Sequence, residues 1–141
     1  MNEVISEPSK TPGIVIFVAV LNFLSAALFF IFSSLSLMVL IFGNVMGIYD
    51  FMTHQITRYY PSANLSLGFN FIFITFLAVS LVFLIFFLMI GLGLLKGRRL
   101  AWYFQIALSI MGLLGIPFGT ILNVVILIFF FQAPVRDYFK V

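Results

Sequence analysis

Apolar residues occupy four segments of this chain, and short polar or charged stretches separate them. The first segment runs from Ile14 to about Ile48 and the second from about Leu67 to Leu95. Two shorter segments follow, at about 100–115 and 118–132. A helix of about 20 apolar residues spans the hydrocarbon core of a bilayer, with a lower limit of about 17. The pattern therefore predicts an all-α integral membrane four-helix bundle, with a long first helix and a short third and fourth helical hairpin, over residues 14–133.

Small and polar residues recur three or four positions apart along the first segment, which places them on one face of a single long helix. They are Asn22, Ala26, Phe29, Ser33, Ser36, Leu40, Gly43 and Gly47. A similar stripe in the later segments contains Gln105, Ser109, Gly112 and Asn123. Small residues let helices approach closely in lipid, and amides and hydroxyls bond across the contact. Both stripes are predicted helix-packing faces, and the first helix can kink at Gly43 or Asn44.

Residues 49–66 are polar enough to leave the hydrocarbon core. Asp50, His54 and Arg58 lie four apart on one helical face, which predicts a short amphipathic extension of the first helix, lying in the membrane interface and ending before Pro61. The spacing of Asp50 and His54 would also suit a weak external metal or proton site. A catalytic zinc needs about three protein ligands, so such a site requires several copies of the chain.

The stretch GIPFGT interrupts the last apolar run without any charge. Gly115 can end one helix, and Pro117 suits the first turn of the next. Gly119 permits close packing, and the Thr120 hydroxyl can bond back to an unpaired backbone group. The stretch is therefore a predicted hairpin turn between the third and fourth helices. A full crossing is favoured, and a re-entrant hairpin is the alternative.

The charges predict the orientation of the four helices. With both termini inside, the cytoplasmic segments contain Lys10, Lys96, Arg98, Arg99, Arg136 and Lys140, and the outer segments contain only Arg58. This distribution follows the positive-inside rule. The N-terminal stretch resembles a non-cleaved signal anchor more than a signal peptide. Residues 1–13 and 134–141 are expected to be cytoplasmic tails, the first of them flexible, in a multi-pass protein of the cell membrane.

The composition supports this assignment and narrows the chemistry. Hydrophobic residues make up 64% of the 141 residues and charged residues 8%, against about 25% charged residues in soluble domains. Cysteine is absent, and the sequence shows no nucleophile–base pair, glycine-rich phosphate loop or basic stripe. We therefore expect no enzyme activity, no cofactor and no nucleic acid. Lys96, Arg98 and Arg99 set the topology or contact anionic lipid head groups.

Residues 91–139 carry a family resemblance. A basic turn at KGRR, the I-P-x-G-T turn at 116–120 and the closing APVRDYF stretch resemble a widespread group of small, uncharacterised prokaryotic membrane proteins with four helices. The resemblance implies the four-helix topology. The fourth helix of that group often has glycine and aromatic residues after the threonine, whereas this chain has Asn123 followed by valine and isoleucine.

Two functions fit these patterns. The first is a non-catalytic membrane protein that acts through helix–helix or lipid contacts, as a homo-oligomer or as an accessory subunit of a membrane complex. Its partners would be membrane lipids and copies of itself or other integral membrane subunits. The alternative is a homo-oligomeric passive channel or small-solute permeation protein, whose intramembrane amides and hydroxyls line a pore. No charged residue lies within the predicted spans, which disfavours ion-coupled transport.

Overall fold

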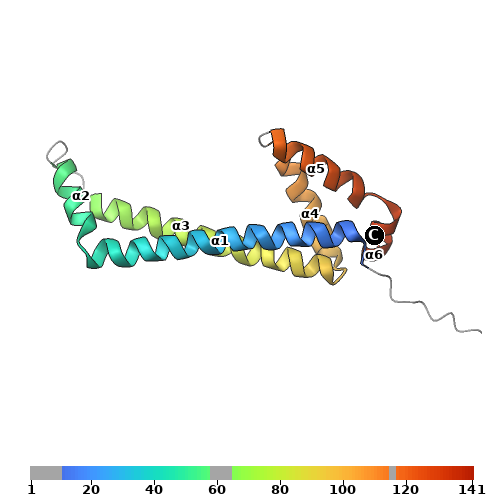
Figure 1. Ribbon diagram of the computed structural model, residues 1–141, viewed down its shortest axis with the longest axis horizontal. Coiled ribbons are helices and arrows are strands. Elements are labelled where there is room, and N and C mark those ends of the chain that lie inside the picture. Colours follow the sequence, from blue (N-terminus) through green and yellow to red (C-terminus); the bar gives the residue numbers. More distant parts are fainter. Residues whose placement is uncertain (1–10, 58–64, 115–116) are drawn as a thin grey trace, which may run out of the picture. The chain divides into compact units, whose positions relative to one another are not determined.

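The computed structural model describes residues 11–57, 65–114 and 117–141, and this part of the chain is all α-helical. Figure 1 shows its six helices. Two of them are long and apolar: α1 (Gly13–Val45) and α3 (Leu65–Leu95). At 1.5 Å per residue they extend about 50 Å and 47 Å, more than the roughly 30 Å of a hydrocarbon core. By length and composition both can cross a membrane, so the predicted all-α membrane protein is confirmed at this level.

A second helix, α2 (Ile48–Thr57), follows α1 after a break. The sequence predicts a continuous extension with a kink at Gly43 or Asn44, and this detail is wrong. The chain turns at Met46 and Gly47, where Gly47 has a φ of 66°. Only glycine adopts this left-handed conformation without steric cost, so α1 ends at Val45 and α2 starts at Ile48, after the turn. Arg58 lies outside the described residues.

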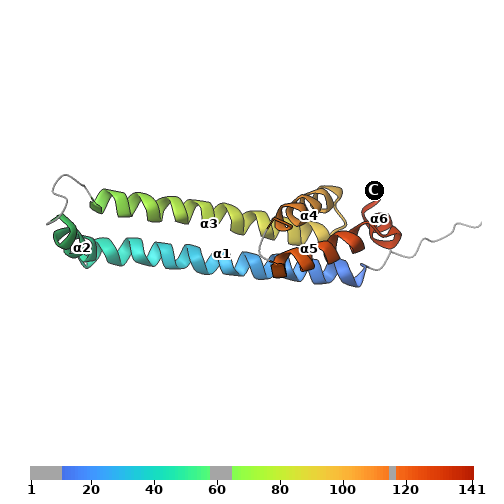
Figure 2. The same cartoon turned by 90° about the horizontal axis from the view of Figure 1, so that it is seen from above.

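The chain divides into two compact units. The central unit contains Ser25–Phe86, and the terminal unit contains Met1–Leu24 together with Phe87–Val141. In the central unit, the second half of α1 lies beside the first half of α3, as the two views in Figure 1 and Figure 2 show. The Phe29 and Phe83 rings stack with centroids 5.1 Å apart, and the Tyr49 and Phe69 rings stack at 5.9 Å.

The terminal unit contains the N-terminal part of α1, the C-terminal part of α3 and three shorter helices. These are α4 (Arg99–Gly112), α5 (Pro117–Phe130) and α6 (Ala133–Phe139). Helices α4 and α5 form the expected hairpin and are in contact, and the start of α5 at Pro117 fits the preference of proline for the first helical turn. Residues 1–10 and Gly115 lie outside the described part of the chain.

The short helices differ from the predicted spans in length. Helices α4 and α5 each have 14 residues, or about 21 Å, which is less than the hydrocarbon core. Among the described residues, only α5 and α6 taken together are long and apolar enough for a further span, and this pair is bent by 73° between Thr120–Phe130 and Ala133–Phe139. Residues 134–141 are expected to form a tail, whereas most of them belong to the helix Ala133–Phe139, in which Val135 and Phe139 are buried.

Candidate functional site

A chain of buried amides and a hydroxyl crosses the terminal unit. The Asn22 Nδ2 atom donates to the Val18 carbonyl oxygen on its own helix and to Gln105 Oε1 on α4, both at 2.8 Å. Gln105 Nε2 donates in turn to Ser109 Oγ at 3.4 Å. The three polar side chains are 4%, 6% and 0% exposed. Predicted stripe residues 83 positions apart thus bond to one another, and their polar atoms are satisfied inside the protomer.

The hairpin of α4 and α5 is joined by small residues and side-chain bonds. Gly112 lies directly against the Asn123 amide, which occupies the space that a Cβ would need. The Thr120 hydroxyl donates to the Leu113 carbonyl oxygen at 3.2 Å, a backbone group at the end of α4, as the GIPFGT stretch led us to expect. Gly119 lies in the first turn of α5.

Two aromatic residues, Trp102 and Tyr103, follow the basic turn, and one is buried while the other is exposed. Trp102 is buried, and its indole Nε1 donates to the Phe130 carbonyl oxygen at 3.2 Å. Tyr103 is exposed and meets the indole edge-on, with ring centroids 4.9 Å apart. Amphipathic aromatic residues beside basic ones are typical of a membrane boundary, and of these two only Tyr103 has the exposure that this role requires. Trp102 instead satisfies a carbonyl at the last residue of α5.

In the central unit the small residues of the first stripe are turned inward. Ala26, Ser33 and Ser36 are 3–5% exposed. The Ser33 hydroxyl donates to the Phe29 carbonyl oxygen one turn earlier at 2.9 Å. Gly43 is buried against the Tyr49 ring, which occupies the space that a Cβ would need. The small-residue face of α1 is therefore buried by the chain itself.

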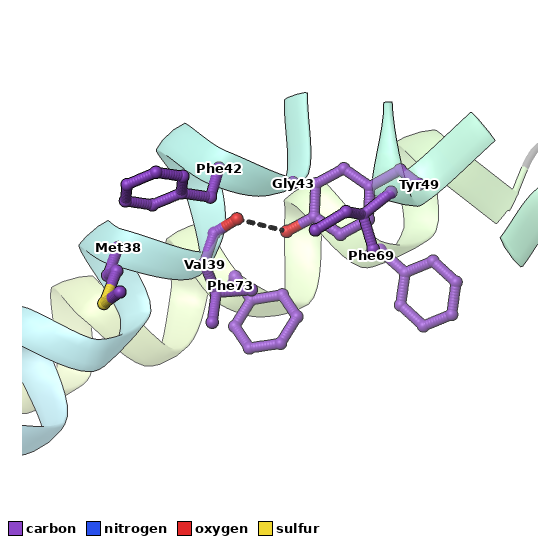
Figure 3. Close-up of a pocket in the computed structure, with 8 residues that line it drawn as sticks. Met38, Val39, Phe42, Gly43, Tyr49, Phe69 and Phe73 are labelled. Carbon is purple, nitrogen blue, oxygen red and sulfur yellow. Dashed lines mark hydrogen bonds between the residues drawn. The ribbon is translucent and has the colours of Figure 1, made fainter. Parts of the chain in front are cut away.

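An apolar cavity of about 390 Å³ lies where α1, α2 and α3 of the central unit meet. It is lined by Met38, Val39, Phe42, Gly43, Ile48, Tyr49, Phe69 and Phe73. Figure 3 shows the Tyr49 phenol directed back to α1, where its hydroxyl donates to the Val39 carbonyl oxygen at 3.2 Å. The volume falls in the range of small-molecule sites. Among the lining side chains only Tyr49 carries a hydroxyl, and this hydroxyl already bonds to Val39. The cavity therefore has no side chain suited to orienting a polar ligand.

The contact between Gly43 and Tyr49 gives a testable prediction. In Gly43→Val the added carbons displace the Tyr49 ring, and overpacking of this kind costs roughly 1–3 kcal/mol. Backbone amides of α2 should then exchange about 5 to 150 times faster with deuterium, measured by mass spectrometry in lipid nanodiscs. Ala27→Val, at an exposed position of the same helix, serves as the control. Unchanged exchange in Gly43→Val would show that the ring does not hold α2 in place.

Asp50 and His54, the weak external site of the sequence analysis, are both exposed on α2. The described residues contain no group of three or more His, Asp or Glu side chains that could hold a metal ion. The basic residues Lys96, Arg98 and Arg99 are exposed around the turn from α3 to α4.

Two polar contacts were not anticipated from the sequence. Asn44 and Asn70 exchange amide hydrogen bonds of 3.1 and 3.3 Å between α1 and α3. The Tyr138 hydroxyl on α6 donates to the Leu95 carbonyl oxygen at 2.7 Å. Asparagines flanked by long apolar runs were the available signal for the first contact. Nothing local indicates the second, because its partners are 43 residues apart and one of them is a backbone group.

Comparison with other proteins adds no assignment: the chain matches no family model, no curated protein and no solved structure.

Proposed function

We propose that the protein is a non-catalytic component of the cell membrane that acts through helix–helix and lipid contacts, as a homo-oligomer or as an accessory subunit of a membrane complex. The observation that carries the proposal is the outer face of α3. Gly68 and Thr75 are exposed there, and an apolar groove of about 310 Å³ is lined by Phe71, Ile72, Thr75, Phe76 and Val79.

This face has the character of an unused helix-packing surface. Apart from the adjacent residues and the backbone of α3 itself, no described atom lies within 4 Å of the position of a Cβ on Gly68, and among residues 67–86 only Ser80 is fully buried. Small residues flanked by large apolar ones allow a second helix to approach closely in lipid. The small-residue face of α1 is buried within the protomer, so the proposed contact uses α3 instead.

The buried amides support a contact protein over the alternative of a passive channel. A pore needs polar groups that face water, whereas Asn22, Gln105 and Ser109 are buried and bonded to one another within the protomer. Their arrangement is that of interhelical hydrogen bonds in a membrane bundle.

The proposal includes four crossings with both termini inside. The charge distribution supports it, and so does the bond from Tyr138 to Leu95, because it keeps the C-terminal helix beside the turn between α3 and α4. Short helices such as α4 and α5 can be accommodated by local thinning of the bilayer. Reporter fusions that fluoresce only in the cytoplasm test the orientation: fusions at both termini and at the 96–99 turn should fluoresce, and a fusion within 58–64 should not.

Assembly is tested by native mass spectrometry after gentle solubilisation from the membrane. We expect a discrete homo-oligomer or a stoichiometric complex with other subunits, and no conductance after reconstitution into planar bilayers. In Thr75→Trp a bulky ring fills the groove, so the assembly should fall apart into protomers. Leu81→Trp is the matched control, since Leu81 is also exposed but lies about 120° around the helix from Thr75. A wild-type protein that remains monomeric in lipid would contradict the proposal.

A further inference from the structure

The C-terminal helix is fixed against the basic turn of the terminal unit. Tyr138 makes the connection: its hydroxyl donates to the Leu95 carbonyl oxygen at 2.7 Å and accepts from Thr11 Oγ1 at 3.2 Å. A Cβ added at Gly97 would lie 3.3 Å from the Tyr138 carbonyl oxygen. Val135 and Phe139 are 2% and 1% exposed. The residues of α6 therefore have defined positions and do not belong to a free tail.

The contact joins two turns, one at the end of α3 and one at the end of α6. At the end of α3, Gly97 has a φ of 62°, its N–H donates to the Leu94 carbonyl oxygen, and the Arg98 N–H donates to that of Gly93. At the end of α6, Lys140 has a φ of 55° and bonds in the same pattern to Asp137. These are the bonds of a Schellman motif, which ends a helix in a defined direction.

The two turns bring positive charge together. Lys96, Arg98 and Arg99 surround the first turn, and Arg136 and Lys140 lie on α6 and at its end. All five are exposed. Asp137 is the one acidic residue of α6. The same region includes the start of α4, where Arg98 is the N-cap without a side-chain cap and the first turn has no acidic residue.

The five exposed cations at these two turns repel one another, although the C-terminal end of α6 favours Arg136 and Lys140. A helix N-terminus carries a partial positive charge and favours anions, yet Arg98 and Arg99 stand at the start of α4. The orientation of the protein in the membrane does not explain why α6 lies against the basic turn. The positive-inside rule depends only on the number of Lys and Arg residues in the loops. An anion located between the turn and α6 would relieve the repulsion from both sides.

We infer that the basic turn and α6 together form a binding surface for the phosphate head groups of anionic phospholipids in the adjacent leaflet. Clusters of four to eight basic residues beside a membrane helix attract anionic lipids, and each basic residue strengthens binding about fivefold. The protein already lies in the membrane that supplies these lipids. This inference deepens the proposed lipid contact and rests on it, but not on the assembly through α3.

The test uses the full chain reconstituted in nanodiscs of equal parts phosphatidylglycerol and phosphatidylcholine, followed by native mass spectrometry of the retained lipids. The wild type should retain phosphatidylglycerol in preference to phosphatidylcholine. The variant Arg136→Gln/Lys140→Gln should bind phosphatidylglycerol about 25-fold more weakly, from two losses of about fivefold each. Equal retention of the two lipids by the wild type would overturn the inference.

A second variant tests whether lipid binding requires the position of α6 or only the number of positive charges. Tyr138→Phe retains all five cations but loses the bonds to Leu95 and Thr11, so α6 loosens and retention should drop several-fold. Tyr103→Phe, an exposed tyrosine near the same turn, is the control and should retain lipid like the wild type. If Tyr138→Phe matches the control, the docked surface does not exist as inferred.

The same spectra distinguish this inference from the proposed assembly. Tyr138→Phe should change the bound lipid and leave the oligomeric mass unchanged, whereas Thr75→Trp should do the reverse. Displacement of phosphatidylglycerol by millimolar inorganic phosphate would identify a general anion site and contradict the assignment to lipid.

Discussion

Gln105→Leu is expected to destabilise the protein by roughly 1–3 kcal/mol, because it leaves a buried Asn22 donor without its acceptor. Asn22→Leu should cost a similar amount, since it removes the donor to Gln105 Oε1. Replacing both residues by leucine removes donor and acceptor together and should cost less than the sum of the single changes. The difference should be about 0.6–1.7 kcal/mol, the range of interhelical hydrogen bonds in membranes.

The chain provides its own reporter for this double-mutant cycle. Its single tryptophan, Trp102, is buried in the same unit, so its fluorescence during unfolding by sodium dodecyl sulfate in mixed micelles reports stability. Gln132→Leu is the control: Gln132 is exposed and caps α6 without a side-chain bond, so the change should stay within about 0.5 kcal/mol. Additive costs in the double variant would show that the two amides do not interact.

Gly93→Ala is expected to destabilise the protein, although alanine normally favours a helix over glycine by about 1 kcal/mol. A Cβ at Gly93 would lie 2.7 Å from the Ala101 Cβ at the start of α4. Ala101 is buried and has no flexible side chain that could move away. The helices must separate, and overpacking of this kind costs roughly 1–3 kcal/mol.

Two other glycines of α3 serve as controls for this change. At Gly91 a Cβ would lie 2.8 Å from the edge of the Phe23 ring, and a ring can rotate away, so the loss should be smaller. At Gly68 no described atom lies within 4 Å, and alanine should stabilise the protein by up to about 1 kcal/mol. Thermal loss of helical circular dichroism in detergent measures all three. Stabilisation by Gly93→Ala would contradict the close packing of α3 and α4.

The helices themselves could largely be predicted from the sequence. Apolar runs longer than a bilayer is thick leave the backbone no stable alternative to helix, and α3 begins within two residues of the predicted start and ends at the predicted residue. The break after α1 was placed three or four residues early. A glycine pattern along a helix indicates close packing and a helix end equally well, and only the positive φ of Gly47 distinguishes them.

The site was less accessible to sequence reasoning. The stripe from Asn22 to Gly43 indicates a packing face, but not whether the protomer or a partner covers it. The 83-residue separation of Asn22 and Gln105 has no local signature. In α3 apolar residues surround the helix on every side, so no periodicity marks the face that remains exposed around Thr75. Orientation and assembly stay predictions.

The sequence by itself determined the class of protein: long uncharged apolar runs commit the chain to helices in a membrane, because unpaired backbone groups are too costly in lipid. Only the tertiary structure decided which polar groups meet. It turned Trp102 inward to the Phe130 carbonyl oxygen, and it docked α6 on the turn after α3 through Tyr138. The reason is physical: membrane insertion depends on summed hydrophobicity along a segment, whereas pairing depends on the rotation of each helix about its axis, which packing between distant segments sets.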